Sequence, residues 1–393
     1  MAKFVIAKNK KVSNSIPNDL VPSILSNLSI KSLKRFECVC KSWTLLFENL
    51  YFKSLFHKRF FSNNHSYYDD TSLLLYQAMN DNKLELYSLS GGKFENRVKL
   101  DWPNPFQEDV PKFQISGSSS INGIFCLTSF FLPNVRVVLW NPATEEFKVV
   151  PTSPIESVPY INVDIAKYGF GYDCVIDDYK VIRHVFCFPK NDIDVMLLED
   201  ATYDSFWEIY NLKSNSWREL EVDVPIGIEE KGVCLDGVFH WRGQNEFIDD
   251  EDDKAYLLSF ELSTEKFVVT PILLGEDSLD FEFFWRDLMV LNGSIALISN
   301  YSNVDTFHIC ILGKFGVKES WFKLFIVRPL SCIECPIGVG KKADIFFTKE
   351  DGKLVYFDLN TQVIEELSFT GDGFWDKPII YKESLLSIGE INM

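Results

Sequence analysis

Residues 260–267 read FELSTEKF, and this pattern decides the fold because four other segments share it. Each copy starts with an aromatic residue, passes through a short polar turn and reaches another apolar residue seven positions on. The other copies are YSLSGGKF (87–94), WNPATEEF (140–147), YNLKSNSW (210–217) and FDLNTQVI (357–364). A sixth, degenerate copy, KFGVKESW (314–321), lacks the leading aromatic residue. Strand-like residues on both sides of a small, polar turn predict a β-hairpin at each copy.

A second kind of turn signal lies between the copies. Asn or Asp followed by Gly supplies the positive φ angles of tight two-residue hairpins. Such pairs occur at Asn122-Gly123, Asp236-Gly237, Asn292-Gly293 and Asp351-Gly352, and Asp177-Asp178 fills the missing place. A repeat of roughly 45–55 residues with several strands per unit is typical of a β-propeller. We therefore expect six or seven blades; a pair of β-sandwiches is the alternative.

Composition agrees with a strand-rich protein. Aromatic residues make up 15% of the 393 residues, and aromatic side chains favour strands. No apolar run approaches the ~20 residues of a membrane span, and the N-terminal apolar run is too short for a signal peptide. We expect no membrane contact and a location in the cytoplasm, the nucleus or both. The nine cysteines are then expected to be reduced.

Charge divides the chain into two parts. Residues 1–60 contain 11 Lys and Arg against 3 Asp and Glu, whereas the remainder contains 28 against 53. An acidic body is a poor ligand for nucleic acid, because phosphate contacts need a surplus of Lys and Arg. A basic head and an acidic body suggest two modules with different partners. The charges of the head could in principle contact nucleic acid, but most of them are dispersed on a helical pattern, so we expect no nucleic-acid partner.

The head has the pattern of three short helices. Asn18 or Asp19 can cap the first helix, and its apolar residues recur at i, i+4 and i+8. The same periodicity continues through a second and a third segment up to Phe47. Helices this short bury little core on their own. The head is therefore expected to present apolar surface to a partner.

The segment RFECVCKSW (35–43), together with Ile16-Pro17 and Ile24-Leu25, resembles the F-box of plant proteins. Ser23 and Ser29 depart from that pattern, which has an acidic residue and a proline there. The resemblance implies docking on the Skp-type adaptor of a cullin-based ubiquitin ligase, and through the adaptor on the cullin and RING subunits. The expected adaptor contacts are Pro17, Leu20, Ile24, Leu25, Leu28, Leu33, Phe36, Val39, Cys40 and Trp43.

The body resembles a second plant family. GFGYDCVIDDYKVIRHV (169–185), LDGVFHW (235–241) and LNGSIALI (291–298) are similar to the F-box-associated interaction domain, found in S-locus F-box and F-box/kelch-repeat proteins. The expected fold is a small all-α F-box followed by an all-β propeller. We divide the chain into a disordered basic tail (1–14), the F-box (15–60), a linker (61–71) and the kelch-like propeller (72–390).

Residues for catalysis or cofactor binding are not evident in the sequence. The five histidines do not pair at metal-ligand spacing, and Cys332 and Cys335 form half of a zinc site at most. Gly169 and Gly171 lack the third glycine of a dinucleotide-binding loop. We therefore expect no cofactor, no metal and no catalytic residue. A propeller enzyme would need such clusters.

These observations favour a non-catalytic receptor that presents a target protein for ubiquitination. Loops tolerate change and carry recognition on rigid scaffolds, so target binding is expected on the segments 151–164, 192–204 and 244–253. The candidate residues there are Glu156, Asp192, Asp194, Gln244, Asp249, Asp250 and Glu251. Because these loops are acidic, the target is expected to have a basic face. The alternative function is a carbohydrate- or peptide-binding propeller that acts without ubiquitin transfer.

Overall fold

The computed structural model divides the chain into two compact units, residues 1–63 and 64–393. The residues that the structure describes are 20–25, 36, 39, 41–48, 52, 71–78, 84–91, 94, 96–107, 113–129, 136–159, 161–189, 204–222, 224, 228–244, 255–272, 283–301, 304–317, 320–327, 333–339, 344–349, 354–359, 361–367, 379–384 and 388. The N-terminal unit contains helix α1 (Val21–Leu25) and helix α3 (Lys41–Glu48). Its described elements are thus helical, as the sequence predicts.

In the part of the C-terminal unit that the structure describes, the elements are strands and one 3-10 helix, η1 (Pro154–Ser157). Its first half contains β1 (Thr71–Ala78), β2 (Leu84–Ser90), β3 (Asn96–Leu100), β4 (Phe113–Ile121), β5 (Ile124–Ser129), β6 (Val137–Asn141), β7 (Glu146–Val149), β8 (Ile161–Asp173), β9 (Asp178–Pro189), β10 (Asp204–Asn211) and β11 (Ser216–Leu220). Its second half contains β12 (Ile228–Leu235), β13 (Val238–Gln244), β14 (Ala255–Glu261), β15 (Lys266–Pro271), β16 (Phe283–Leu291), β17 (Ser294–Tyr301), β18 (Val304–Leu312), β19 (Trp321–Val327), β20 (Ile333–Val339), β21 (Asp344–Lys349), β22 (Leu354–Asp358), β23 (Val363–Glu366) and β24 (Ile379–Lys382).

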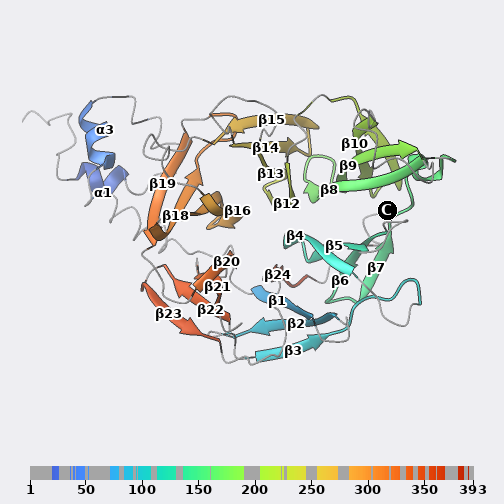
Figure 1. The fold of residues 1–393 in the computed structure, drawn as a ribbon, viewed down its shortest axis with the longest axis horizontal. Coiled ribbons are helices and arrows are strands. Elements are labelled where there is room, and N and C mark those ends of the chain that lie inside the picture. The colour runs from blue at the N-terminus through green and yellow to red at the C-terminus, as the bar shows by residue number, and fades with distance from the viewer. Residues whose placement is uncertain are drawn as a thin grey trace, which may run out of the picture. The chain divides into compact units, whose positions relative to one another are not determined.

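These strands form four-stranded sheets around a ring, which confirms a β-propeller (Figure 1). Four sheets are made of consecutive strands: β8–β11, β12–β15, β16–β19 and β20–β23. An eight-stranded sheet, in the order β3-β2-β1-β24-β4-β5-β6-β7, joins two further four-stranded units at β24 and β4. The described residues thus contain six such units, and the number of blades in the whole chain stays a prediction.

The C-terminal strand completes the unit formed by the first strands. β24 lies beside β1 as an antiparallel partner, with Thr71 opposite Lys382 and Leu74 opposite Ile379. A single parallel bridge joins Ile380 to Ser119 of β4. Strands from both ends of the unit therefore share one sheet, which removes a free sheet edge (Figure 1).

In the repeated eight-residue segment, or octapeptide, the first and last residues form a cross-strand pair. The first and last residues of three copies lie opposite each other as Trp140–Phe147, Tyr210–Trp217 and Phe260–Phe267, and Phe357–Ile364 is the fourth such pair. Two copies depart from the predicted register. Tyr87 lies opposite Lys99, because five residues separate the paired Ser90 and Asn96. Trp321 lies opposite Leu312, because the intervening loop is longer than the motif implies.

The Asn-Gly and Asp-Gly turns adopt the predicted conformation. Asn122, Asp236 and Asn292 have φ between 47° and 52°, and the glycine that follows each also has a positive φ. Asp351-Gly352 lies outside the described residues. The prediction for Asp177-Asp178 is wrong in detail: Asp173 and Asp178 pair across a four-residue turn, and within it only Asp177 has a positive φ.

The contact between the β8–β11 sheet and the β12–β15 sheet depends on two glycines of β8. A Cβ atom on Gly169 would lie 2.9 Å from the Trp241 ring, and one on Gly171 would lie 2.4 Å from Leu262. The Trp241 indole N–H donates to the Tyr168 carbonyl at 3.2 Å. The Gly-Phe-Gly segment is therefore a packing motif, because a side chain at either glycine would displace the neighbouring blade.

Candidate functional site

The predicted adaptor contacts in the N-terminal unit fall into two groups. Leu20, Ile24 and Val39 are exposed, at 49%, 44% and 60%. By contrast, Leu25 is buried, and the Phe36 and Trp43 rings pack edge to face with centroids 5.2 Å apart. Pro17, Leu28, Leu33 and Cys40 lie outside the described residues. The first group has apolar surface available for a partner, and the second supports the local fold.

An exposed apolar residue in α3 was missed by the periodicity argument. Leu45 is 67% exposed, although it sits two residues from the half-buried Trp43. The signal available in the sequence is a leucine that lies off the face shared by Trp43 and Leu46. Leu45 therefore joins Leu20, Ile24 and Val39 as apolar surface of the head.

Most of the predicted target-binding residues lie outside the described residues: Asp192, Asp194, Asp249, Asp250 and Glu251. The backbone of Gln244 ends β13, opposite Ala255. Part of the segment 151–164 is not a loop, because β8 begins at Ile161. The long spacing between Trp140 and Tyr210 instead reflects, in part, the lengths of β8 and β9, which have 13 and 12 residues.

Glu156 is described, and its carboxylate is engaged within the chain. Arg183 donates to it at 2.5 Å, and the Ser153 N–H donates to it at 3.2 Å. Arg183 also binds Glu208 at 2.6 Å and lies over the Trp217 ring, 4.1 Å from its centroid. Glu156 therefore ties η1 to the β8–β11 sheet, and its role in target binding stays a prediction.

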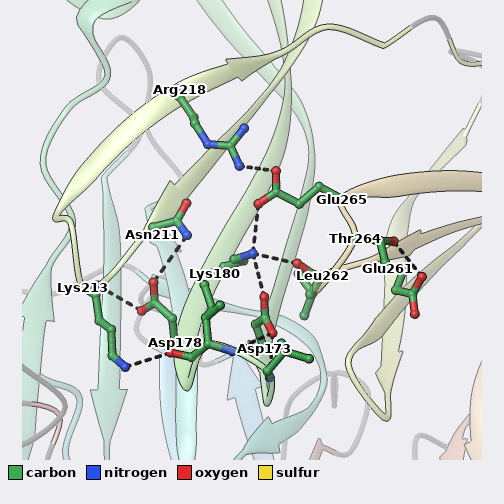
Figure 2. Close-up of polar contacts among 12 residues, drawn as sticks. Asp173, Asp178, Lys180, Asn211, Lys213, Arg218, Glu261, Leu262, Thr264 and Glu265 are labelled. Carbon is green, nitrogen blue, oxygen red and sulfur yellow. Dashed lines mark hydrogen bonds and ion pairs between the residues drawn. The ribbon is translucent and has the colours of Figure 1, made fainter.

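A buried ionic network joins two blades near one set of turns (Figure 2). The Lys180 ammonium on β9 donates to Asp173 at 2.8 Å, to the Leu262 carbonyl at 2.7 Å and to Glu265 at 2.9 Å. The side chains of Lys180 and Asp173 are only 2% and 1% exposed. Arg218 donates to the other oxygen of Glu265. All three protons of the Lys180 ammonium thus have partners, two of them on the neighbouring blade.

The carboxylates of this network are held in the charged form. Burial alone would raise the pKa of Asp173, but hydrogen bonds from Lys180 and from the Val175 N–H lower it below its ordinary value. For Glu265, burial is likewise opposed and outweighed by hydrogen bonds from Arg218 and Lys180, so its pKa is also lowered. The ion pairs therefore persist at neutral pH.

The network also fixes the turn between β8 and β9, which the sequence predicts at Asp177-Asp178. Asp173 Oδ1 accepts the N–H groups of Val175 at 2.9 Å and Ile176 at 3.4 Å. Lys213 donates to the Ile176 carbonyl at 2.9 Å. The Cys174–Asp177 turn between β8 and β9 is thus held from both sides by charged groups. The sequence signal for Lys180 was a lone lysine within the apolar pattern of residues 179–186.

Six tryptophans of the body could line a sugar or peptide surface, although most are expected in the blade cores: Trp140, Trp207, Trp217, Trp241, Trp285 and Trp321. Trp140, Trp207, Trp217 and Trp241 are at most 9% exposed. Within the described ranges, no group of three or more His, Cys, Asp and Glu side chains is placed to hold a metal ion. The described helices are also too short or too polar to cross a membrane.

The fold and the head together define a class: a β-propeller that carries an F-box at its N-terminus. The family model for the F-box domain matches residues 14–55. The model described as the F-box associated beta propeller domain matches residues 75–379, which is more than half of the chain. The chain therefore belongs to the family of F-box proteins with an F-box-associated β-propeller.

Curated relatives are plant F-box proteins. F-box protein CPR1 from Arabidopsis thaliana is 26% identical over 90% of this chain and 84% of its own length. An F-box/LRR-repeat/kelch-repeat protein from the same plant is 24% identical over 95% of this chain and 97% of its own length. A putative F-box protein from that plant is 28% identical, and the match covers 66% of this chain and 61% of that protein.

Solved structures give only a distant likeness. An oligogalacturonate lyase from Vibrio parahaemolyticus matches with a TM-score of 0.42 and 11% identity, over 76% of each chain. A structure titled as the Dos1 propeller matches with a TM-score of 0.35 and 10% identity, over 77% of this chain and 69% of that one. We draw no functional conclusion from either.

Proposed function

We propose that this protein is the substrate-recognition subunit of an SCF-type cullin ubiquitin ligase. The observation that carries the proposal is the presence of both family domains, 14–55 and 75–379, in one chain. The head would bind the Skp-type adaptor, and the propeller would bind the target protein. The chain would form no covalent bond itself.

The physical role of such a receptor is positioning. Holding a target lysine near a charged conjugating enzyme raises its effective concentration and lowers the entropic part of the barrier. Two properties of the chain support this role. The head has exposed apolar residues on short helices, which favours a docked partner, and the body is a rigid scaffold of hydrogen-bonded sheets.

The alternative, a carbohydrate- or peptide-binding propeller acting without ubiquitin transfer, has less support. A sugar platform needs exposed aromatic rings, whereas the four tryptophans at 140, 207, 217 and 241 are buried. The two functions differ in one simple requirement, since only the receptor needs to bind the adaptor.

Adaptor binding should depend on the exposed apolar residues of the head. Replacing Ile24 and Val39 together by Asp places two charges in the proposed interface, which should weaken adaptor binding at least ~100-fold. Because both side chains are exposed, the helices should remain folded. Isothermal titration calorimetry of the purified full-length protein with a plant Skp-type adaptor measures the change in adaptor affinity.

The matched control is Val98→Asp, an equally exposed valine (56%) on the outer strand β3 of the propeller. It should bind the adaptor like the wild type. A wild-type chain that does not bind the adaptor would overturn the proposed function and favour the alternative. If the double variant binds the adaptor with unchanged affinity, Ile24 and Val39 are not part of the interface, and other residues of the head must form it.

A further inference from the structure

The Cys174–Asp177 turn carries an apolar tip on the surface of the propeller. Val175 is 73% exposed, the highest value among the large apolar side chains of the described residues, and Ile176 is 49% exposed. Fully burying such a side chain is worth ~1.5–3 kcal/mol. Two neighbouring exposed aliphatic residues at a hairpin tip therefore gain most when a partner covers them.

The backbone of this tip is held in place before any partner arrives. Its two N–H groups are bound by Asp173, which is in turn bound by the buried Lys180. The Ile176 carbonyl accepts a hydrogen bond from Lys213. A loop that becomes ordered on binding loses conformational entropy, which weakens the binding. This turn is already ordered in the folded protein, so that entropic cost is small. Such preorganisation is the property expected of a binding element on a rigid scaffold.

Acidic side chains flank the tip. Asp177 is 70% exposed, and it accepts a hydrogen bond from Tyr172 and pairs with Lys213 at 3.5 Å. Asp236 is exposed on the β12–β13 turn, which lies alongside: a Cβ on Gly237 would be 3.5 Å from the Tyr172 carbonyl oxygen. The apolar tip thus has two exposed carboxylates, Asp177 and Asp236, against one lysine, Lys213, and it lies on an acidic body.

We propose that Val175 and Ile176 are the apolar anchor by which the propeller holds its target protein, in a pocket of the target that is bordered by Lys or Arg. This proposal rests on the proposed function, since it names the surface that takes the target. A second copy of this chain is a poor occupant, because the net charge of −17 repels like copies.

A photocrosslinking experiment identifies the occupant. The photoreactive residue p-benzoylphenylalanine replaces Val175 in the full-length protein, and plant extract is irradiated with it. The control carries the same residue at Val363, an exposed valine (50%) on β23. We expect a protein that is crosslinked from position 175 and not from position 363. Crosslinks only to the adaptor, to a second copy, or equally from both positions would overturn the proposal.

The decisive measurement is the affinity of that protein, purified, for variants of this chain. Replacing Val175 and Ile176 by Ser should raise Kd at least ~10-fold, with adaptor affinity unchanged. The matched variant, Val363→Ser with Ile364→Ser on β23, should leave Kd unchanged. Asp236→Asn keeps an Asn-Gly turn but removes the charge, so it should slow association a few-fold and reduce its dependence on salt.

Loss of binding in the tip variant alone supports the proposal. Equal Kd values for the tip variant and the wild type would overturn it, and so would a Kd that rises equally in the β23 variant. The proposed function fails separately, through the adaptor titration. A variant that binds the adaptor but not the crosslinked protein therefore distinguishes the two claims.

Discussion

Removing residues 376–393 should abolish cooperative folding of the propeller. The deleted segment includes β24, which supplies a strand to the sheet of β1, β2 and β3. It also contains four buried side chains, Ile379, Ile380, Tyr381 and Ile388. Losing them costs ~1.5–3 kcal/mol each, and the total is comparable with the ~5–15 kcal/mol that stabilises an ordinary domain.

Further contacts tie the same segment to the second blade. The Asn141 amide donates to the Ser384 carbonyl at 2.9 Å, and the Ile388 N–H donates to Glu146 at 2.9 Å. Urea unfolding followed by tryptophan fluorescence tests the prediction, and deletion of residues 391–393 alone is the control. A chain shortened to residue 375 that unfolds at the wild-type urea concentration would contradict the closure of the ring by β24.

Lys180→Met should destabilise the propeller by ~3–5 kcal/mol, because it leaves a buried carboxylate without its cation. The orphaned group is Asp173, since Glu265 keeps its pair with Arg218. The Leu262 carbonyl also loses a donor from the neighbouring blade. The free energy of unfolding from urea titrations at pH 7 measures the cost.

Two controls separate the buried charge from a general effect of losing a lysine. Lys213→Met removes a lysine that is 41% exposed and should change stability by less than ~1 kcal/mol. Combining Lys180→Met with Asp173→Asn should recover part of the loss, because the amide oxygen can still accept from the turn N–H groups. A Lys180→Met protein as stable as the Lys213→Met protein would show that the network contributes little.

The parts of the fold that are local in sequence were predictable. The octapeptide encodes a hairpin within eight residues, so four of its five copies have the predicted cross-strand pair. The register predicted for the copy at 87–94 is wrong, because the pattern does not specify how many residues lie within the turn. Phe94, expected on the returning strand, has a φ of 57° and packs instead against Phe346 and Tyr356.

The network around Lys180 could not be predicted in the same way. Its partners Leu262 and Glu265 are 82 and 85 residues away in the chain, and they meet only because two blades pack side by side. The Val175–Ile176 tip was overlooked for a related reason. In the sequence, an exposed apolar residue of a turn looks the same as a buried one. Only the packing of the neighbouring sheets decides which of the two it is.

The head was predicted as helical and apolar, but its sequence did not separate residues that support the helices from residues that face outward. The F-box resemblance groups Leu20, Ile24 and Leu25 together as adaptor contacts, whereas burial divides them, because only Leu25 is buried. That division determines which substitutions test adaptor binding and which test folding.

The central claim is that one chain couples a target protein to a ubiquitin ligase, and ubiquitin-remnant mass spectrometry in plant cells tests it most directly. Lysine ubiquitination is compared between cells that express the wild type and cells that express the Ile24→Asp, Val39→Asp variant. The account predicts that the protein crosslinked from position 175 loses most of its ubiquitination in the variant cells. Unchanged ubiquitination of that protein, with adaptor binding abolished in the variant, would contradict the account.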